Sequence, residues 1–246
     1  MDFLDKVLIT SGLEFKNGLY SEIIDFAHMK TKNEIIAETI HRQCPIGVSV
    51  KGKSIVLGGE DFDGGVFQDG FIFQEPFRKV QMLEPREGAA CVVINGDTIW
   101  IAGGNIGEEA LQSTEYLYLD SHNLCSVQGP DLPFPIDGHS MIQISPSCIY
   151  VIGGFIKGWP SKKTWMIDPT DHFFMREGPS LLENRLCYSC AKMVLDGRVV
   201  IVVAGGIGKD TTELLDPLSD EGWVPGNTDL EINVHILNVI TDLIRS

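Results

Sequence analysis

The stretch that decides the fold is residues 98–104, TIWIAGG, in which an apolar run ends at a pair of glycines. Three other apolar runs end in the same way, and the four doublets are Gly58-Gly59, Gly103-Gly104, Gly153-Gly154 and Gly205-Gly206. The second glycines of successive doublets are 45, 50 and 52 residues apart. A period of this length is typical of repeated four-stranded sheets, whereas helical solenoids have shorter units. The chain is therefore expected to be an all-β repeat domain.

One repeat unit can be followed through residues 138–178. Strand-like segments separated by turn residues lie at 138–144, 148–152, 163–167 and 172–176. The second strand of each unit is apolar at almost every position, which indicates that both of its faces are covered. Sheets stacked radially around an axis would provide that cover, so the pattern predicts a β-propeller.

These units resemble the kelch repeat. The resemblance lies in the glycine doublets, in Thr-Glu pairs at 114–115 and 212–213, and in Arg86, His139 or Arg185 ahead of the first strand. It implies a single kelch-type propeller over residues 1–246. The predicted blades are blade 1, shared by 5–38 and 230–240, blade 2 at 44–82, blade 3 at 88–128, blade 4 at 138–176 and blade 5 at 187–224.

The prediction of five blades depends on the two ends of the chain. Ser11-Gly12 stands where the other units have a glycine doublet, and residues 34–37 are expected to be the outer strand of blade 1. This blade lacks an innermost strand, which the alternating residues 229–236 could supply. Kelch propellers close their ring in this way. The alternative is an incomplete six-bladed propeller whose last residues form a short amphipathic helix.

Charge and composition exclude several classes of protein. The formal charge of −15 disfavours nucleic acid as a partner, and no apolar run approaches the length of a membrane span. The acidic start of the chain does not fit a signal peptide, so a cytoplasmic protein is expected. The six cysteines are expected to be free, and Cys187 and Cys190 should point to opposite faces of one strand. We expect no metal or cofactor.

No catalytic motif is recognisable, so the chain is not expected to be an enzyme. Each glycine doublet joins two strands, which favours a structural role over phosphate binding. The main prediction is a non-catalytic propeller that binds a partner protein or peptide through its loops, as an adaptor or scaffold. The alternative is a sugar isomerase or epimerase of the kelch-like type, with Arg and His side chains at the central channel.

Two groups of residues are candidates for partner binding. Arg42, Arg86 and Arg185 precede innermost strands and could meet around one end of the channel, or each could brace its own blade by pairing with a carboxylate such as Glu87 or Glu183. The loops after the glycine doublets supply the second group, which favours a basic or mixed-charge partner. Its members are Glu60, Asp61, Asp63, Glu108, Glu109, Phe155 and Trp159.

Overall fold

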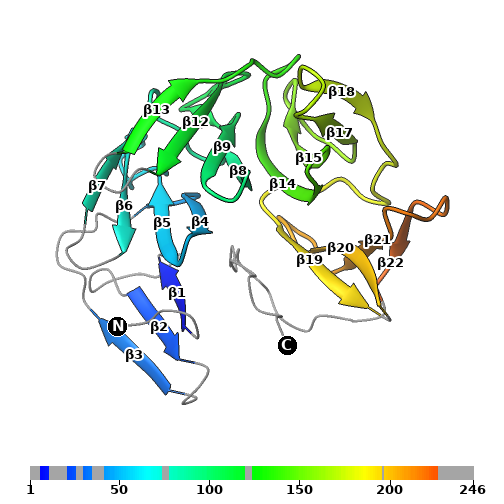
Figure 1. Cartoon of the computed structure of the whole chain (residues 1–246), viewed down its shortest axis with the longest axis horizontal. Helices are drawn as coiled ribbons and strands as arrows, with labels where there is room; N and C mark the ends of the chain where they lie inside the picture. Colours follow the sequence, from blue (N-terminus) through cyan, green and yellow to red (C-terminus); the bar gives the residue numbers. More distant parts are fainter. Residues whose placement is uncertain are drawn as a thin grey trace.

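The computed structural model describes residues 6–10, 21–25, 30–34, 42–73, 78–119, 124–195 and 197–226. These residues form an all-β structure in which four four-stranded antiparallel sheets stand in a ring (Figure 1). No helix among them is long and apolar enough to cross a membrane. The four sheets correspond to blades 2 to 5 of the sequence prediction, and we keep those numbers for them.

Each of the four blades runs through the chain from its inner to its outer strand. Blade 2 contains β4 (Ile46–Val50), β5 (Lys53–Leu57), β6 (Asp69–Phe73) and β7 (Arg78–Gln81). Blade 3 contains β8 (Ala90–Ile94), β9 (Thr98–Ala102), β12 (Thr114–Leu119) and β13 (Leu124–Gln128). Blade 4 contains β14 (Asp137–Ser145), β15 (Cys148–Ile156), β17 (Thr164–Asp168) and β18 (Phe174–Glu177). Blade 5 contains β19 (Ser189–Leu195), β20 (Arg198–Ala204), β21 (Thr212–Leu215) and β22 (Trp223–Pro225).

Short strands also form within two of the loops that follow the glycine doublets. In blade 3, β10 (Asn105–Ile106) pairs with β11 (Glu109–Ala110). In blade 4, β16 (Trp159–Pro160) pairs with the end of β15. These hairpins give the loops a defined backbone.

A separate three-stranded sheet precedes blade 2. Its strands are β1 (Lys6–Thr10), β2 (Ser21–Asp25) and β3 (Lys30–Glu34), in that order. The outer strand was expected at 34–37. Glu34 is the last residue of β3, opposite Ser21 of β2, and residues 35–37 lie outside the described residues. The predicted closing strand at 230–240, and the alternative helix, lie outside the described residues.

The second strands of blades 3 and 4 are buried between the neighbouring blades, as their apolar pattern predicts. In β9, Ile99 and Ile101 pack against blade 2, while Trp100 and Ala102 pack against blade 4. The same division occurs in β15, where alternate residues belong to the cores on either side. Burial on both faces removes the apolar area of a whole strand from water, which stabilises the contact between neighbouring blades.

The glycine doublets connect each blade to the next. The N–H of Gly59 donates to the carbonyl of Arg86 at 2.7 Å, and Gly104 and Gly154 make the corresponding bonds to Ile136 and Arg185. Gly58 has a φ of +63°, and a β-carbon there would lie 2.1 Å from the same Arg86 oxygen. Only glycine combines this backbone conformation with so close an approach.

Candidate functional site

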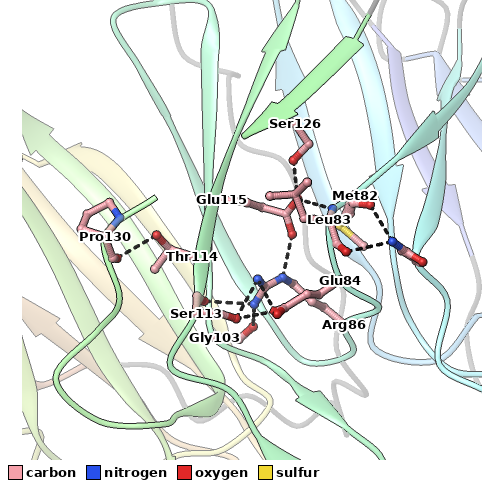
Figure 2. A network of polar contacts seen from close by, with 11 residues as sticks. Met82, Leu83, Glu84, Arg86, Gly103, Ser113, Thr114, Glu115, Ser126 and Pro130 are labelled. Carbon is pink, nitrogen blue, oxygen red and sulfur yellow. Dashed lines mark hydrogen bonds and ion pairs between the residues drawn. The ribbon is translucent and has the colours of Figure 1, made fainter. Parts of the chain in front are cut away.

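Arg86 is completely buried, and every N–H of its guanidinium has an acceptor (Figure 2). Its Nε donates to Glu115 Oε1 at 2.8 Å, and its Nη1 donates to the carbonyls of Gly103 and Ser113 at 2.7 and 3.0 Å. Its Nη2 donates to Glu84 at 3.0 Å and to the Ser113 hydroxyl at 2.9 Å. The side chain therefore ties together the second and third strands of blade 3.

The other two predicted arginines make the same kind of contact. Arg185 Nε donates to Glu213 Oε1 at 3.0 Å, and its Nη1 donates to the Gly205 carbonyl at 2.7 Å. Arg42 pairs with Asp69 and donates to the Gly58 carbonyl at 2.8 Å. Like Arg86, both are buried.

The three arginines do not come together at the axis of the ring. Each side chain turns into its own blade, towards a carboxylate on the third strand rather than towards Glu87 or Glu183. This arrangement favours the bracing role over a role in presenting charge to a partner. The sequence left both roles open because the positions of these residues before the innermost strands do not determine where their side chains point.

Blade 4 has an apolar version of the same connection. Ile136 takes the place of the arginine, because its carbonyl accepts from Gly104 as the Arg86 carbonyl accepts from Gly59. Trp165 stands where blades 3 and 5 have the paired carboxylate, one residue into the third strand, and the Phe134 ring packs on it at 4.8 Å. His139 was thus wrongly matched with the arginines.

The replacement in blade 4 also removes a backbone donor. Glu115 accepts from the Leu83 N–H at 2.7 Å, and Glu213 accepts from the Leu182 N–H at 2.6 Å. The corresponding residue of blade 4 is Pro133, which has no N–H. The segments 82–86, MLEPR, and 181–185, LLENR, correspond to 132–136, LPFPI. Blade 4 therefore lacks both the backbone N–H that donates this hydrogen bond in blades 3 and 5 and the carboxylate that accepts it.

His139 fills space between blades and contributes to no polar site. Its Cε1 lies 3.0 Å from the position that a β-carbon of residue 103 would occupy. Neither ring nitrogen has a hydrogen-bond partner among the described residues, and burial lowers the pKa of His139 to about 3. The imidazole is therefore neutral, and the expected grouping of arginines with His139 is not formed.

The axis of the ring is lined instead by the residues two positions after the arginines and Ile136. We call Cys44, Gly88, Gly138 and Cys187 the axial residues. Their backbones are linked in succession, because each N–H donates to the preceding carbonyl at 3.0, 2.8 and 3.1 Å. All four have φ between 47° and 58°. Cys44, Gly88 and Cys187 precede β4, β8 and β19, and Gly138 lies at the start of β14; these are the strands nearest the centre in Figure 1.

Polar side chains from three blades meet beside these axial residues. Glu87 hydrogen-bonds to Glu60 and Asn105, and the Asn105 amide donates to Asp137 at 3.2 Å. The pKa of Glu87 is raised to about 7, chiefly by burial and to a smaller extent by the hydrogen bond with Glu60. The Glu87 carboxyl therefore gains or loses its proton near neutral pH. We call these four residues the axial cluster.

The opposite side of the axis is apolar. Phe155 and Ile207 occupy the places that Glu60 and Asn105 have in blades 2 and 3, and Leu186 occupies that of Glu87. The surroundings of the axis are thus acidic next to blades 2 to 4 and apolar next to blade 5. The acidic side and the apolar side are built from the same repeat positions, so the two sides differ only in which side chains stand at those positions.

The loops after the glycine doublets share one end of the propeller, which we call the loop face. Each of its four loops carries a large exposed apolar residue, and these are Phe62, Ile106, Trp159 and Ile207. The exposed fractions are 68%, 39%, 76% and 68%. Exposed apolar side chains that gather on one face mark an interaction surface, whereas isolated ones are ordinary.

The predicted loop residues are divided by the structure. Asp63, Glu108, Glu109 and Trp159 are exposed on the loop face. Glu60 belongs to the axial cluster, and Asp61 accepts from the N–H groups of residues 63 and 65, which shapes its own loop. Phe155 is partly buried at the base of the Trp159 hairpin.

Several residues of this end of the molecule were missed by sequence reasoning, namely Phe62, Glu87, Asn105, Ile106, Asp137 and Ile207. The exposed apolar residues Phe62, Ile106 and Ile207 stand three, two and one residues after their glycine doublets, so no fixed spacing could identify them as a group. The alignment of residues 82–86, 132–136 and 181–185 would have placed Glu87, Asp137 and Leu186 at one repeat position.

The cysteines offer no metal centre among the described residues. All six are free, and no group of three or more His, Cys, Asp or Glu side chains in this part of the chain could hold a metal ion. Cys190 is buried in the core, which raises the pKa of its thiol to about 12. Cys187 instead contacts Cys44, so the Cys-x-x-Cys sequence does not act as a unit.

Comparison with known proteins supports the architecture. A solved structure of YjhT superposes on the chain with a TM-score of 0.67, covering 92% of this chain and 85% of YjhT at 13% identity. The chain is a β-propeller. At this level of identity the likeness shows the fold alone. No family model and no curated protein matches the propeller sequence.

Proposed function

We propose that this propeller is of the kelch type, with five blades, and that it binds a partner protein or peptide through its loop face as an adaptor or scaffold. Glycine doublets and the buried Arg–Glu pairs of blades 3 and 5 support the kelch assignment. Five blades follow if residues 230–240 complete the N-terminal sheet. The observation that carries the function is the exposed apolar side chain in each of four successive loops.

The proposed partner segment is basic and contains aromatic or branched apolar residues. Asp63, Glu108 and Glu109 are exposed beside Phe62 and Ile106, and the whole chain has a charge of −15. Oppositely charged partners are steered towards such a surface, while the apolar side chains provide the buried area. An aromatic anchor such as Trp159 is typical of an interaction hot spot.

Selection from a random peptide library on the immobilised propeller tests this function. We expect the selected peptides to be enriched in Lys or Arg together with aromatic or aliphatic residues. For a synthetic copy of the best peptide, Trp159→Ala should weaken binding about 30-fold in a fluorescence anisotropy titration, since hot-spot truncations cost on the order of 2 kcal/mol. Higher salt should weaken it further.

Leu218→Ala provides the matched control for this test. Leu218 is 94% exposed, but it lies in the turn between β21 and β22, at the other end of the blade from the loop face. Its removal should leave peptide affinity and the melting temperature unchanged. Selected peptides without basic residues, or an equal loss of affinity in the Trp159→Ala and Leu218→Ala variants, would contradict the proposed surface.

A second candidate function rests on the axial cluster. The pKa of Glu87, raised to about 7 by burial and by the neighbouring Glu60, suits general acid–base chemistry on a small molecule such as a sugar. The buried Oδ1 atoms of Asn105 and Asp137 have no partner among the described residues and could accept from hydroxyl groups. In this role the propeller would be a sugar isomerase or epimerase, acting through carboxylates rather than through arginines.

Exchange between the α and β anomers of reducing monosaccharides, followed by NMR, tests this second function. The wild-type protein should accelerate exchange over buffer at pH 7. Glu87→Gln should abolish the acceleration, because the amide cannot give or take a proton as the Glu87 carboxyl does. Asp97→Asn, an exposed change in the turn between β8 and β9, should retain it. No acceleration by the wild-type protein for any sugar would refute this function.

A further inference from the structure

Cys44 and Cys187 come from opposite ends of the described ring, yet their side chains meet. The Cys187 thiol hydrogen-bonds to the sulfur of Cys44, although one residue precedes blade 2 and the other precedes blade 5. Both side chains are partly exposed, and both cysteines are free. They are thus two accessible thiols in contact, far apart in sequence.

The backbone around the axis holds these thiols in place. Gly88 and Gly138 stand between Cys44 and Cys187 in the chain of axial hydrogen bonds, and neither has a side chain. A β-carbon at residue 138 would lie 2.2 Å from Leu186 Cδ1 and 3.4 Å from Cys187 Sγ, so this glycine lies directly beside the Cys187 thiol. All four axial residues share the same left-handed conformation, which directs their backbones alike.

We propose that Cys44 and Cys187 form an oxidative modification site, at which a small-molecule disulfide converts the two thiols into a disulfide bond across the axis of the propeller. In the first step the Cys44 thiolate attacks one sulfur of the reagent, forming a mixed disulfide and releasing one thiolate. Cys187 then loses its proton and attacks the Cys44 sulfur, which expels the second thiol. The two protein thiols are oxidised, and the reagent is reduced to two thiols.

The surroundings assign the two cysteines different parts in this reaction. The hydrogen bond from Cys187 lowers the pKa of Cys44, and this effect outweighs the opposing effects of burial and of Glu87, Glu60 and Asp137. The same contact, together with burial and carboxylates, raises the pKa of Cys187. Cys44 is therefore the first nucleophile, and Cys187 resolves the mixed disulfide.

The axial cluster also selects the reagent. The negative charges of Glu60, Glu87 and Asp137 lie close enough to the Cys44 thiol to oppose the formation of its thiolate. Repulsion should slow an anionic disulfide such as oxidised glutathione. A neutral reagent, 2-hydroxyethyl disulfide, should therefore react faster at equal concentration.

Peptide mapping after treatment with 2-hydroxyethyl disulfide tests the proposal. Trypsin should yield peptide 43–51 joined to peptide 186–192. Because peptide 186–192 contains both Cys187 and Cys190, the Cys190→Ala variant should give the same product. Cys44→Ser and Cys187→Ser should not, and Cys187→Ser should retain a hydroxyethyl adduct on Cys44. Cys125→Ser, which changes an exposed thiol on β13, should behave as wild type.

The melting temperature gives an independent measurement. A bond between residues 44 and 187 closes a loop of more than half the chain, so oxidation should raise the melting temperature by on the order of 5–10 °C, reversibly with dithiothreitol. The proposal is overturned if Cys44 and Cys187 carry only separate adducts, or if the product links Cys44 to Cys190. Peptide binding at the loop face is not needed for either readout.

Discussion

Arg86→Met is expected to lower the free energy of unfolding by about 3–5 kcal/mol, measured by urea denaturation. The loss does not represent the strength of one ion pair. Removing the guanidinium leaves the fully buried Glu115 carboxylate without its cation and removes the hydrogen bonds that Nη1 donates to the carbonyls of Gly103 and Ser113. An unpaired buried charge is costly because the interior solvates it poorly.

Lys51→Met is the control, since it breaks an ion pair with Asp97 in which both side chains are about half exposed. Water screens that pair, so its removal should change stability little. A loss of stability with Arg86→Met no greater than that with Lys51→Met would show that the buried pair is not what stabilises blade 3.

Blade 4 supplies a stricter test of the same explanation. The combined variant Leu83→Pro, Glu84→Phe, Arg86→Ile and Glu115→Trp gives blade 3 the apolar residues that blade 4 has at these positions. It removes the cation, the carboxylate and the backbone donor together, so no buried charge is left unpaired. We expect it to recover at least half of the stability lost in Arg86→Met. If it is less stable than the single variant, the two blades are not equivalent at this site.

Gly58→Ala is expected to have an effect of similar size, on the order of 4 kcal/mol. The new β-carbon would lie 2.1 Å from the Arg86 carbonyl oxygen, and the backbone there has φ of +63°. The clash involves backbone on both sides, so no side-chain rotation can relieve it. Blade 2 would have to move away from blade 3, which would also weaken the Gly59–Arg86 hydrogen bond.

Gly96→Ala separates the two causes of that effect. Gly96 has φ of +76°, but a β-carbon there would meet nothing within 4 Å. Only the conformational strain remains, and we expect a loss of about 1–2 kcal/mol in the same denaturation experiment. Equal losses for Gly58→Ala and Gly96→Ala would mean that the close approach between blades contributes nothing.

The comparison of sequence with structure shows where repeat patterns are informative. The boundaries of β9, β12, β13 and β20 could be read directly, because glycine, proline and Asn-Gly turns end apolar runs there. The outer strand of the N-terminal sheet includes Lys30, four residues before its expected start, because no glycine or proline marks that start. Local signals thus predict strands well only where turns bound them.

The sequence by itself determined the number of four-stranded units among residues 42–226 and the burial of their second strands, because glycine spacing and apolar runs are local properties of the chain. Only the tertiary structure decided that Arg86 and Arg185 turn into their own blades, that Cys44 meets Cys187, and that Glu60, Glu87, Asn105 and Asp137 surround one axis. The physical reason is that these contacts join residues about 20 to 140 positions apart, and the stacking of blades around the axis sets their distance and direction.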